Sequence, residues 1–141
     1  MSRDQSLAAA MMEGGDVEFL RSDAVLSGDL PFSDGVRVGR LVMLSGQLGV
    51  KPGTLELVPG GVEAEARQTL ENVRRTLEAH GLGLRDVVRV QVMLADMSEW
   101  NRFNAVYREF FSAPWPARSA FGANGLALGA RMELEVFAVK R

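Results

Sequence analysis

The spacing of apolar residues predicts one long amphipathic helix near the middle of the chain. Between positions 62 and 79 the apolar residues recur at intervals of four, four, three and four: Val62, Ala66, Leu70, Val73 and Leu77. This spacing places them on one face of a helix. Gly81 follows as a stop signal, because glycine is favoured just after a helix end. A second helix is expected over residues 98–111, capped by Asp96 or Ser98.

Alternation of apolar and polar residues predicts strands on both sides of the first helix. The clearest strand is 86–94, in which one buried face would carry Val88, Val90, Val92 and Leu94. Residues 131–139 alternate in the same way. Further strands are expected at 17–20, 36–38, 41–45 and 117–121, with a hairpin turn or a bulge at Gly39-Arg40. Residues 41–44 are all apolar, so this strand is expected to be covered on both faces.

The order of these elements is strands, helix, strand, helix, strands. It predicts an α+β two-layer domain, with two helices on one face of a mixed or mainly antiparallel sheet. The 141 residues suffice for one ordinary domain, which we place at 17–141. Residues 1–16 are expected to be a flexible leader or an extension left from expression.

Composition removes several classes of function. The formal net charge is −2 and the charges are interspersed, so nucleic acid is not an expected partner. No apolar stretch is long enough to cross a bilayer, so no membrane association is expected. The absence of cysteine excludes disulfides and fits a cytoplasmic protein. A single histidine, His80, cannot build a zinc site of nitrogen and sulfur ligands, and we expect it to be a surface residue capping the first helix.

Two charged residues are candidates for chemistry. Arg118 lies at the start of a strand, where a guanidinium can grip a carboxylate with two parallel hydrogen bonds; a surface arginine is the alternative. Glu133 lies where a polar strip of the last strand becomes apolar, which would raise its pKa for general acid or base work; an ordinary solvated position is the alternative. Trp100 and Trp115 are expected in the core or in an interface.

Several stretches, in order and with few gaps, resemble the RidA/YjgF family, also labelled the endoribonuclease L-PSP family. The most specific match is Pro116-Ala117-Arg118-Ser119, followed at the right distance by Met132-Glu133-Leu134-Glu135. Residues 39–47, 66–73, 87–97 and 103–107 also agree with the family pattern. The resemblance implies a chorismate-mutase-like (YjgF-type) fold and a homotrimer with clefts between subunits.

The resemblance also implies an activity, the hydrolytic deamination of reactive 2-imino and enamine acids, such as 2-aminoacrylate, to 2-oxo acids and ammonia. Arg118 would hold the substrate carboxylate and Glu133 would orient or activate the attacking water. Ser45 and Asn104 would line the cleft, and the backbone at Ala120 would contact the ligand. No metal or cofactor is expected, because an imine is already electrophilic.

The chain departs from the family pattern at three places. Phe32 stands where deaminating members usually carry a tyrosine, Ala120 where they often carry cysteine, and the glycine-rich run 122–129 replaces a common Val-Glu-Val stretch. These changes leave open a non-enzymatic trimer that binds small carboxylate metabolites or partner proteins. An RNA-cleaving protein is a further alternative, which the acidic balance and the single histidine disfavour.

Overall fold

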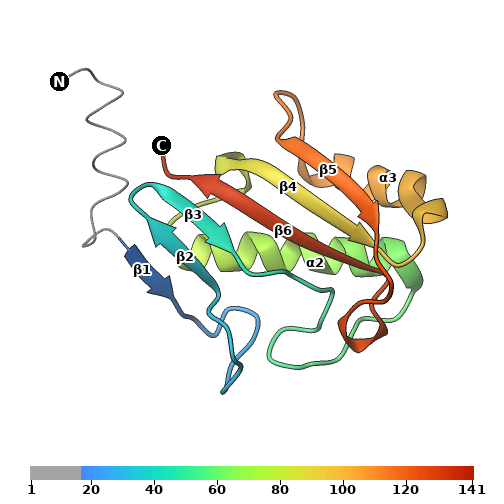
Figure 1. Cartoon of the computed structure of the whole chain (residues 1–141), viewed down its shortest axis with the longest axis horizontal. Helices are drawn as coiled ribbons and strands as arrows, with labels where there is room; N and C mark the ends of the chain where they lie inside the picture. Colours follow the sequence, from blue (N-terminus) through green and yellow to red (C-terminus); the bar gives the residue numbers. More distant parts are fainter. Residues whose placement is uncertain (1–16) are drawn as a thin grey trace.

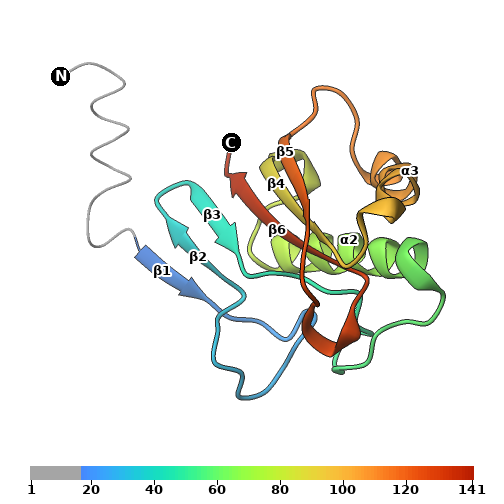
Figure 2. The same ribbon diagram turned by 45° about the vertical axis from the view of Figure 1, so that its right-hand side comes forward.

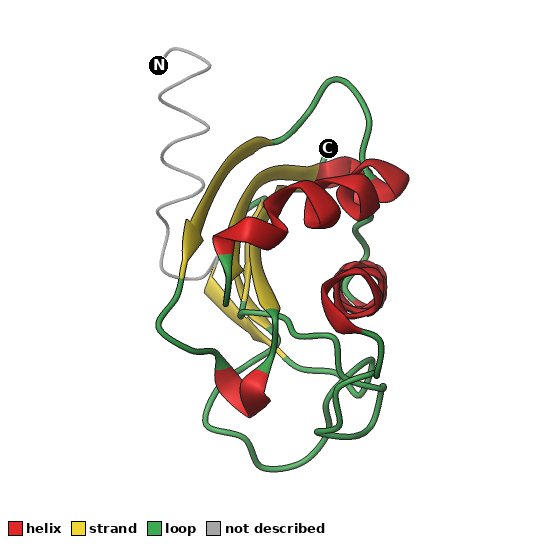
Figure 3. Ribbon diagram, turned by 90° about the vertical axis from the view of Figure 1, so that its right-hand side faces the viewer, coloured by secondary structure: helices red, strands yellow, loops and turns green. Residues whose placement is uncertain are grey.

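Residues 17–141 are described by a computed structural model, in which two helices cover one face of a single six-stranded sheet (Figures 1 and 3). The strands are β1 (Val17–Leu20), β2 (Gly35–Val38), β3 (Leu41–Leu44), β4 (Val87–Leu94), β5 (Ala117–Gly122) and β6 (Met132–Val139). Their order across the sheet is β1-β2-β3-β6-β4-β5. Neighbours are antiparallel except β4 and β5, which run parallel. The predicted α+β class with a mixed sheet is therefore confirmed, and the predicted leader at 1–16 lies outside the described residues.

The helices are α2 (Gly61–Ala79) and α3 (Trp100–Phe110), the second preceded by a short 3-10 turn, η3 (Met97–Glu99). The side chain of Asp96 accepts a hydrogen bond from the backbone N–H of Ser98 at 2.9 Å, which confirms Asp96 as the cap. The regular helix is slightly shorter than the predicted 98–111, because its first turn is wound as 3-10 helix. In Figure 2, β1 and α3 lie at opposite sides of the molecule.

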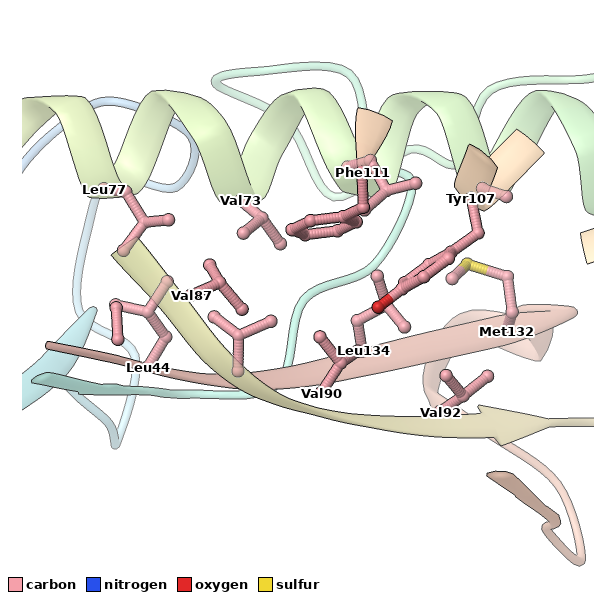
Figure 4. Close-up of a cluster of buried hydrophobic side chains, with 14 of the residues drawn as sticks. Leu44, Val73, Leu77, Val87, Val90, Val92, Tyr107, Phe111, Met132 and Leu134 are labelled. Carbon is pink, nitrogen blue, oxygen red and sulfur yellow. The ribbon is translucent and has the colours of Figure 1, made fainter. Parts of the chain in front are cut away.

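The core lies between α2 and the sheet. All five apolar residues that define the predicted face of α2 are fully buried. Figure 4 shows Val73 and Leu77 pointing from the helix toward side chains of the sheet, among them Val90 and Leu134. Burial of one such side chain contributes about 1.5–3 kcal/mol, so this face fixes the helix on the sheet.

One expectation about β4 was wrong. Val88 was placed on the buried face, but its side chain is 40% exposed, whereas Val87 is buried. The cause is a β-bulge: Val87 pairs with Ala138 and Arg89 pairs with the adjacent Phe137, so Val88 is an extra residue without a partner. The bulge shifts the alternation by one position at the start of the strand and leaves the rest of it as predicted.

The expectation that His80 is a surface residue was also wrong. It does follow α2 as its C-cap residue, but its side chain is only 10% exposed. Its Nε2 lies 3.0 Å from Oδ2 of Asp34, and the hydroxyl of Ser22 donates to the same oxygen at 2.5 Å. His80 therefore ties the end of the helix to the segment before β2.

The outer face of β3 is only partly covered within the chain. Val42 and Leu44 are buried against the helix layer, whereas Leu41 and Met43 are half-buried on the opposite face. Cover was expected on both faces of this strand. Within one chain it is complete only on the face toward the helices. None of the helices in residues 17–141 is long and apolar enough to cross a membrane.

Candidate active site

Arg118 is held by two residues of α3. Its Nη2 donates a hydrogen bond to Oδ1 of Asn104 at 2.7 Å, and its guanidinium carbon lies 4.7 Å from the centre of the Tyr107 ring. Asn104 and Tyr107 are three positions apart, so they share one face of the helix. A hydrogen bond in the plane and a ring below it fix the guanidinium in two directions and leave its remaining N–H groups available.

The surroundings of Arg118 favour an anionic ligand. A hollow of about 250 Å³ is lined by Trp100, Asn104, Tyr107, Arg108, Trp115, Pro116 and Arg118. Burial, reinforced by the positive charge of Arg108, lowers the pKa of Arg118 from its ordinary value. Within residues 17–141 no carboxylate pairs with this guanidinium. A partly desolvated cation without a counter-charge is costly, so a carboxylate entering the hollow would relieve that cost.

The two tryptophans are walls of this hollow rather than core residues. Trp100 is 41% exposed and Trp115 is 48% exposed, which rules out the core position considered for them. The Trp115 ring stacks on Tyr107 at a centroid distance of 6.3 Å and carries the guanidinium of Arg108 at 5.7 Å. Arg118, Tyr107, Trp115 and Arg108 therefore form a continuous series of stacked cations and rings.

Glu133 lies in a second hollow, on the outer face of the sheet. This hollow of about 450 Å³ is lined by Val25, Leu26, Leu30, Phe32, Ser45, Gly46, Gln47, Leu48, Val50, Leu55, Ala127, Leu128 and Glu133. Burial raises the pKa of Glu133, and the negative charge of Glu135 adds to the effect. Among the described residues no group donates a hydrogen bond to the Glu133 carboxylate. A carboxylate with a raised pKa and free acceptor atoms is suited to accept a proton from water.

Gly46 leaves room for this carboxylate. A Cβ built at Gly46 would lie 2.0 Å from Oε2 of Glu133, far inside contact distance. The backbone next to it is fixed, because Gln47 and Leu134 exchange two N–H···O bonds of 2.7 and 3.0 Å. The missing Cβ at Gly46 thus allows the Glu133 carboxylate to occupy its present position.

Ser45 and Phe32 lie in the same hollow as Glu133. The Ser45 hydroxyl donates to the carbonyl of Ser33 at 2.7 Å, so it can offer only its oxygen lone pairs to a ligand. Phe32 is 47% exposed and presents an apolar ring. Three of the six predicted site residues, Ser45, Phe32 and Glu133, are therefore brought together in one place.

The other three predicted residues lie on the opposite side of the sheet, Arg118 and Ala120 in β5 and Asn104 in α3. Arg118 is paired with Val90, whose side chain is buried under the helices, whereas Glu133 is paired with Met93, which alternates to the outer face. Paired residues in a sheet point to the same side. Arg118 and Ala120, two positions apart, thus share the helix side with Asn104. In one chain, Arg118 and Glu133 lie in separate hollows and do not face each other.

Two residues that shape these hollows were not predicted from the sequence as part of a site. The Tyr107 ring is buried and also lies against the guanidinium of Arg118. The signal was the spacing of Asn104 and Tyr107, which any helix would place side by side. Leu128, in the glycine-rich run, lines the hollow of Glu133, and no motif in the sequence indicated this.

Comparison with known proteins places the chain in a family. The family model described as "Endoribonuclease L-PSP" matches residues 24–140. The 2-iminobutanoate/2-iminopropanoate deaminase of Bos taurus is 42% identical over 110 residues, which span 78% of this chain and 80% of that protein. The crystal structure of the E. coli YjgF gene product has a TM-score of 0.81 and 35% identity over 88% of this chain and 99% of the other. That of E. coli TdcF with bound serine has a TM-score of 0.80 and 31% identity over 88% and 99%.

The match over most of the chain defines a small α+β protein of the imine-deaminase class. The chain belongs to the RidA/YjgF family, whose model carries the endoribonuclease L-PSP description.

Proposed function

We propose that this protein hydrolyses 2-imino acids, and the enamines from which they form, to 2-oxo acids and ammonia. The observation that carries the proposal is the environment of the Arg118 guanidinium. Its guanidinium is partly buried, is oriented by Asn104 and Tyr107, and has no carboxylate partner in residues 17–141. It is therefore prepared to bind the carboxylate that every 2-imino acid carries. The deaminase names of relatives at about 40% identity support the same reaction.

Glu133 supplies the proton transfer in this proposal. Its carboxylate accepts a proton from a water molecule while the water oxygen forms a bond to the imine carbon, and the nitrogen takes up that proton to give a carbinolamine. The carboxylate then accepts the hydroxyl proton and passes it to the nitrogen, the carbon–nitrogen bond breaks, and ammonia leaves as the carbonyl forms. One water is consumed and no electrons are exchanged. The imine carbon is already electrophilic, so positioning and one base of suitable pKa are sufficient.

Two copies of the chain complete the site. Since Arg118 and Glu133 project from opposite faces of one sheet, a single chain cannot bring both to the same substrate. We infer that Arg118, Asn104 and the backbone at Ala120 of one copy face Ser45, Phe32 and Glu133 of a neighbour. A cyclic homotrimer would repeat this heterologous contact three times and close it. The half-exposed outer face of β3 is then available to such a contact.

Ammonia release tests the proposed function. 2-Iminopropanoate is generated in place from alanine by an amino-acid oxidase, and the rate is compared with buffer alone. We expect acceleration by the unchanged protein and loss of at least a hundredfold in Arg118→Ala, with Arg118→Lys intermediate because it keeps the charge but not the planar pair of donors. Arg67→Ala is the matched control, because it removes an exposed arginine that pairs with Glu109.

Binding of a 2-oxo acid without acceleration over buffer would contradict the deaminase and favour a carboxylate-binding protein. Phe32, which lacks a hydroxyl, is compatible with either outcome.

A further inference from the structure

The hollow around Glu133 is polar at one end and apolar over most of its wall. Glu133, Ser45 and Gln47 supply the polar side chains. The rest of the wall is dominated by large apolar side chains from three separate segments, namely Leu26, Leu30, Phe32, Leu55 and Leu128. Ligand sites commonly combine an apolar lining with a few convergent polar groups. A volume of about 450 Å³ is far larger than one methyl group requires.

Leu128, in the wall of this hollow, has an energetically unfavourable backbone conformation. Its backbone has φ 61° and ψ 13°, in the left-handed region that leucine rarely adopts. Its side chain is 52% exposed, so burial within the chain does not compensate for this conformation. Strained residues of this kind gather at ligand sites, where their position serves the ligand rather than the fold. Leu128 belongs to the run 122–129, which departs from the family pattern, and it lines the same hollow as Glu133.

We infer that this site selects 2-imino acids whose side chain is large and apolar, of about four carbons, over those derived from alanine. The inference rests on the proposed function and specifies its substrate class. With the imine carbon near Glu133, the side chain of the substrate extends along the leucines while the carboxylate meets Arg118 of the neighbouring copy. Each methylene moved from water into an apolar wall strengthens binding about fourfold. A butyl side chain should therefore exceed a methyl side chain roughly fiftyfold in kcat/KM.

A homologous series of imines measures this directly. An amino-acid oxidase converts alanine, 2-aminobutyrate, norvaline and norleucine to imines that differ only in side-chain length. The kcat/KM for 2-oxo acid release, corrected for hydrolysis in buffer, is plotted against the number of carbons. We expect a rise at each step toward norleucine. Turnover that is flat or falls along the series would overturn the inference and leave the deaminase in place, whereas no acceleration of any imine would overturn the proposed function itself.

Variants of the wall separate a specific pocket from a general preference for apolar substrates. Leu128→Asn introduces a residue that tolerates positive φ and removes part of the apolar wall. The slope of the series, meaning the factor by which kcat/KM rises with each added carbon, should therefore fall at least twofold. Leu55→Asn, at a 57% exposed loop position, should lower the slope in the same direction. Val88→Asn removes an exposed apolar side chain that lines neither hollow and should leave the slope unchanged. An unchanged slope in both leucine variants, with folding verified by circular dichroism, would overturn the inference.

Discussion

The contact between Gly46 and Glu133 gives a quantitative prediction for Gly46→Ala. The added Cβ would stand 2.0 Å from Oε2 and 3.0 Å from Cδ of Glu133, while ordinary contact begins at about 3.4 Å. One group must therefore move by at least about 1.4 Å. The backbone is held by the paired bonds between Gln47 and Leu134, so the end of the Glu133 side chain is the part that moves.

The expected result is a large loss of activity with little loss of stability. A shift of about 1 Å at the reacting group lowers the rate about a hundredfold, so kcat/KM for imine hydrolysis should fall by that factor. The free energy of unfolding should change by less than about 1 kcal/mol, because rotation of a flexible side chain relieves the clash. Both quantities are measured on the same preparation, by ammonia release and by urea denaturation.

Gly83→Ala is the control for the added methyl group. A Cβ at Gly83 would meet nothing within 4 Å, and its φ of −143° suits any residue. This variant should retain full activity. The reasoning would be refuted if Gly46→Ala kept kcat/KM within threefold of the unchanged protein, since the carboxylate would then not need its present position.

Three further predictions follow from the surroundings of the two hollows. Asn72→Ala removes the Nδ2 donor to the carbonyls of Leu48 and Val50, at 3.0 and 2.9 Å, and should lower the free energy of unfolding by about 3–5 kcal/mol in urea. Tyr107→Phe deletes a buried hydroxyl that has no hydrogen-bond partner among residues 17–141, and should raise that free energy by about 1 kcal/mol; a decrease of that size would contradict this. Because burial raises the pKa of Glu133 above its ordinary value, and a base acts as the carboxylate, kcat/KM should fall as pH falls through a midpoint above 4.5; a midpoint below 4.5 would contradict the assignment.

Local patterns predicted the elements of this fold well, since apolar periodicity is set by which face of an element is buried. The fully buried face of α2 and the alternation of β6 follow directly from it. The exception in β4 shows its limit: a bulge adds one residue, and no feature of the local sequence around Val88 signals it. The pairing of His80 with Asp34 joins residues 46 positions apart, which only the tertiary fold decides.

The sequence supplied candidate residues for the site but not their arrangement. Motif resemblance indicated Arg118 and Glu133, but their relation depends on strand order, because the face on which a side chain points follows from its register with a neighbouring strand. The apolar wall could not be predicted either. Its members come from segments far apart in the sequence, and Leu128 enters it through a backbone conformation that sequence patterns do not favour for leucine.

Subunit mixing tests the central claim, an imine-deaminase site built from Arg118 of one copy and Glu133 of another. Arg118→Ala and Glu133→Gln are each expected to be inactive alone. After both are unfolded together and refolded at equal amounts, random assembly in a cyclic oligomer should restore about one quarter of the sites, and with them about one quarter of the original activity. Recovery of ammonia release to that level is the predicted result. Mixed oligomers that form and remain inactive, beside an active unchanged protein treated in the same way, would contradict the shared site.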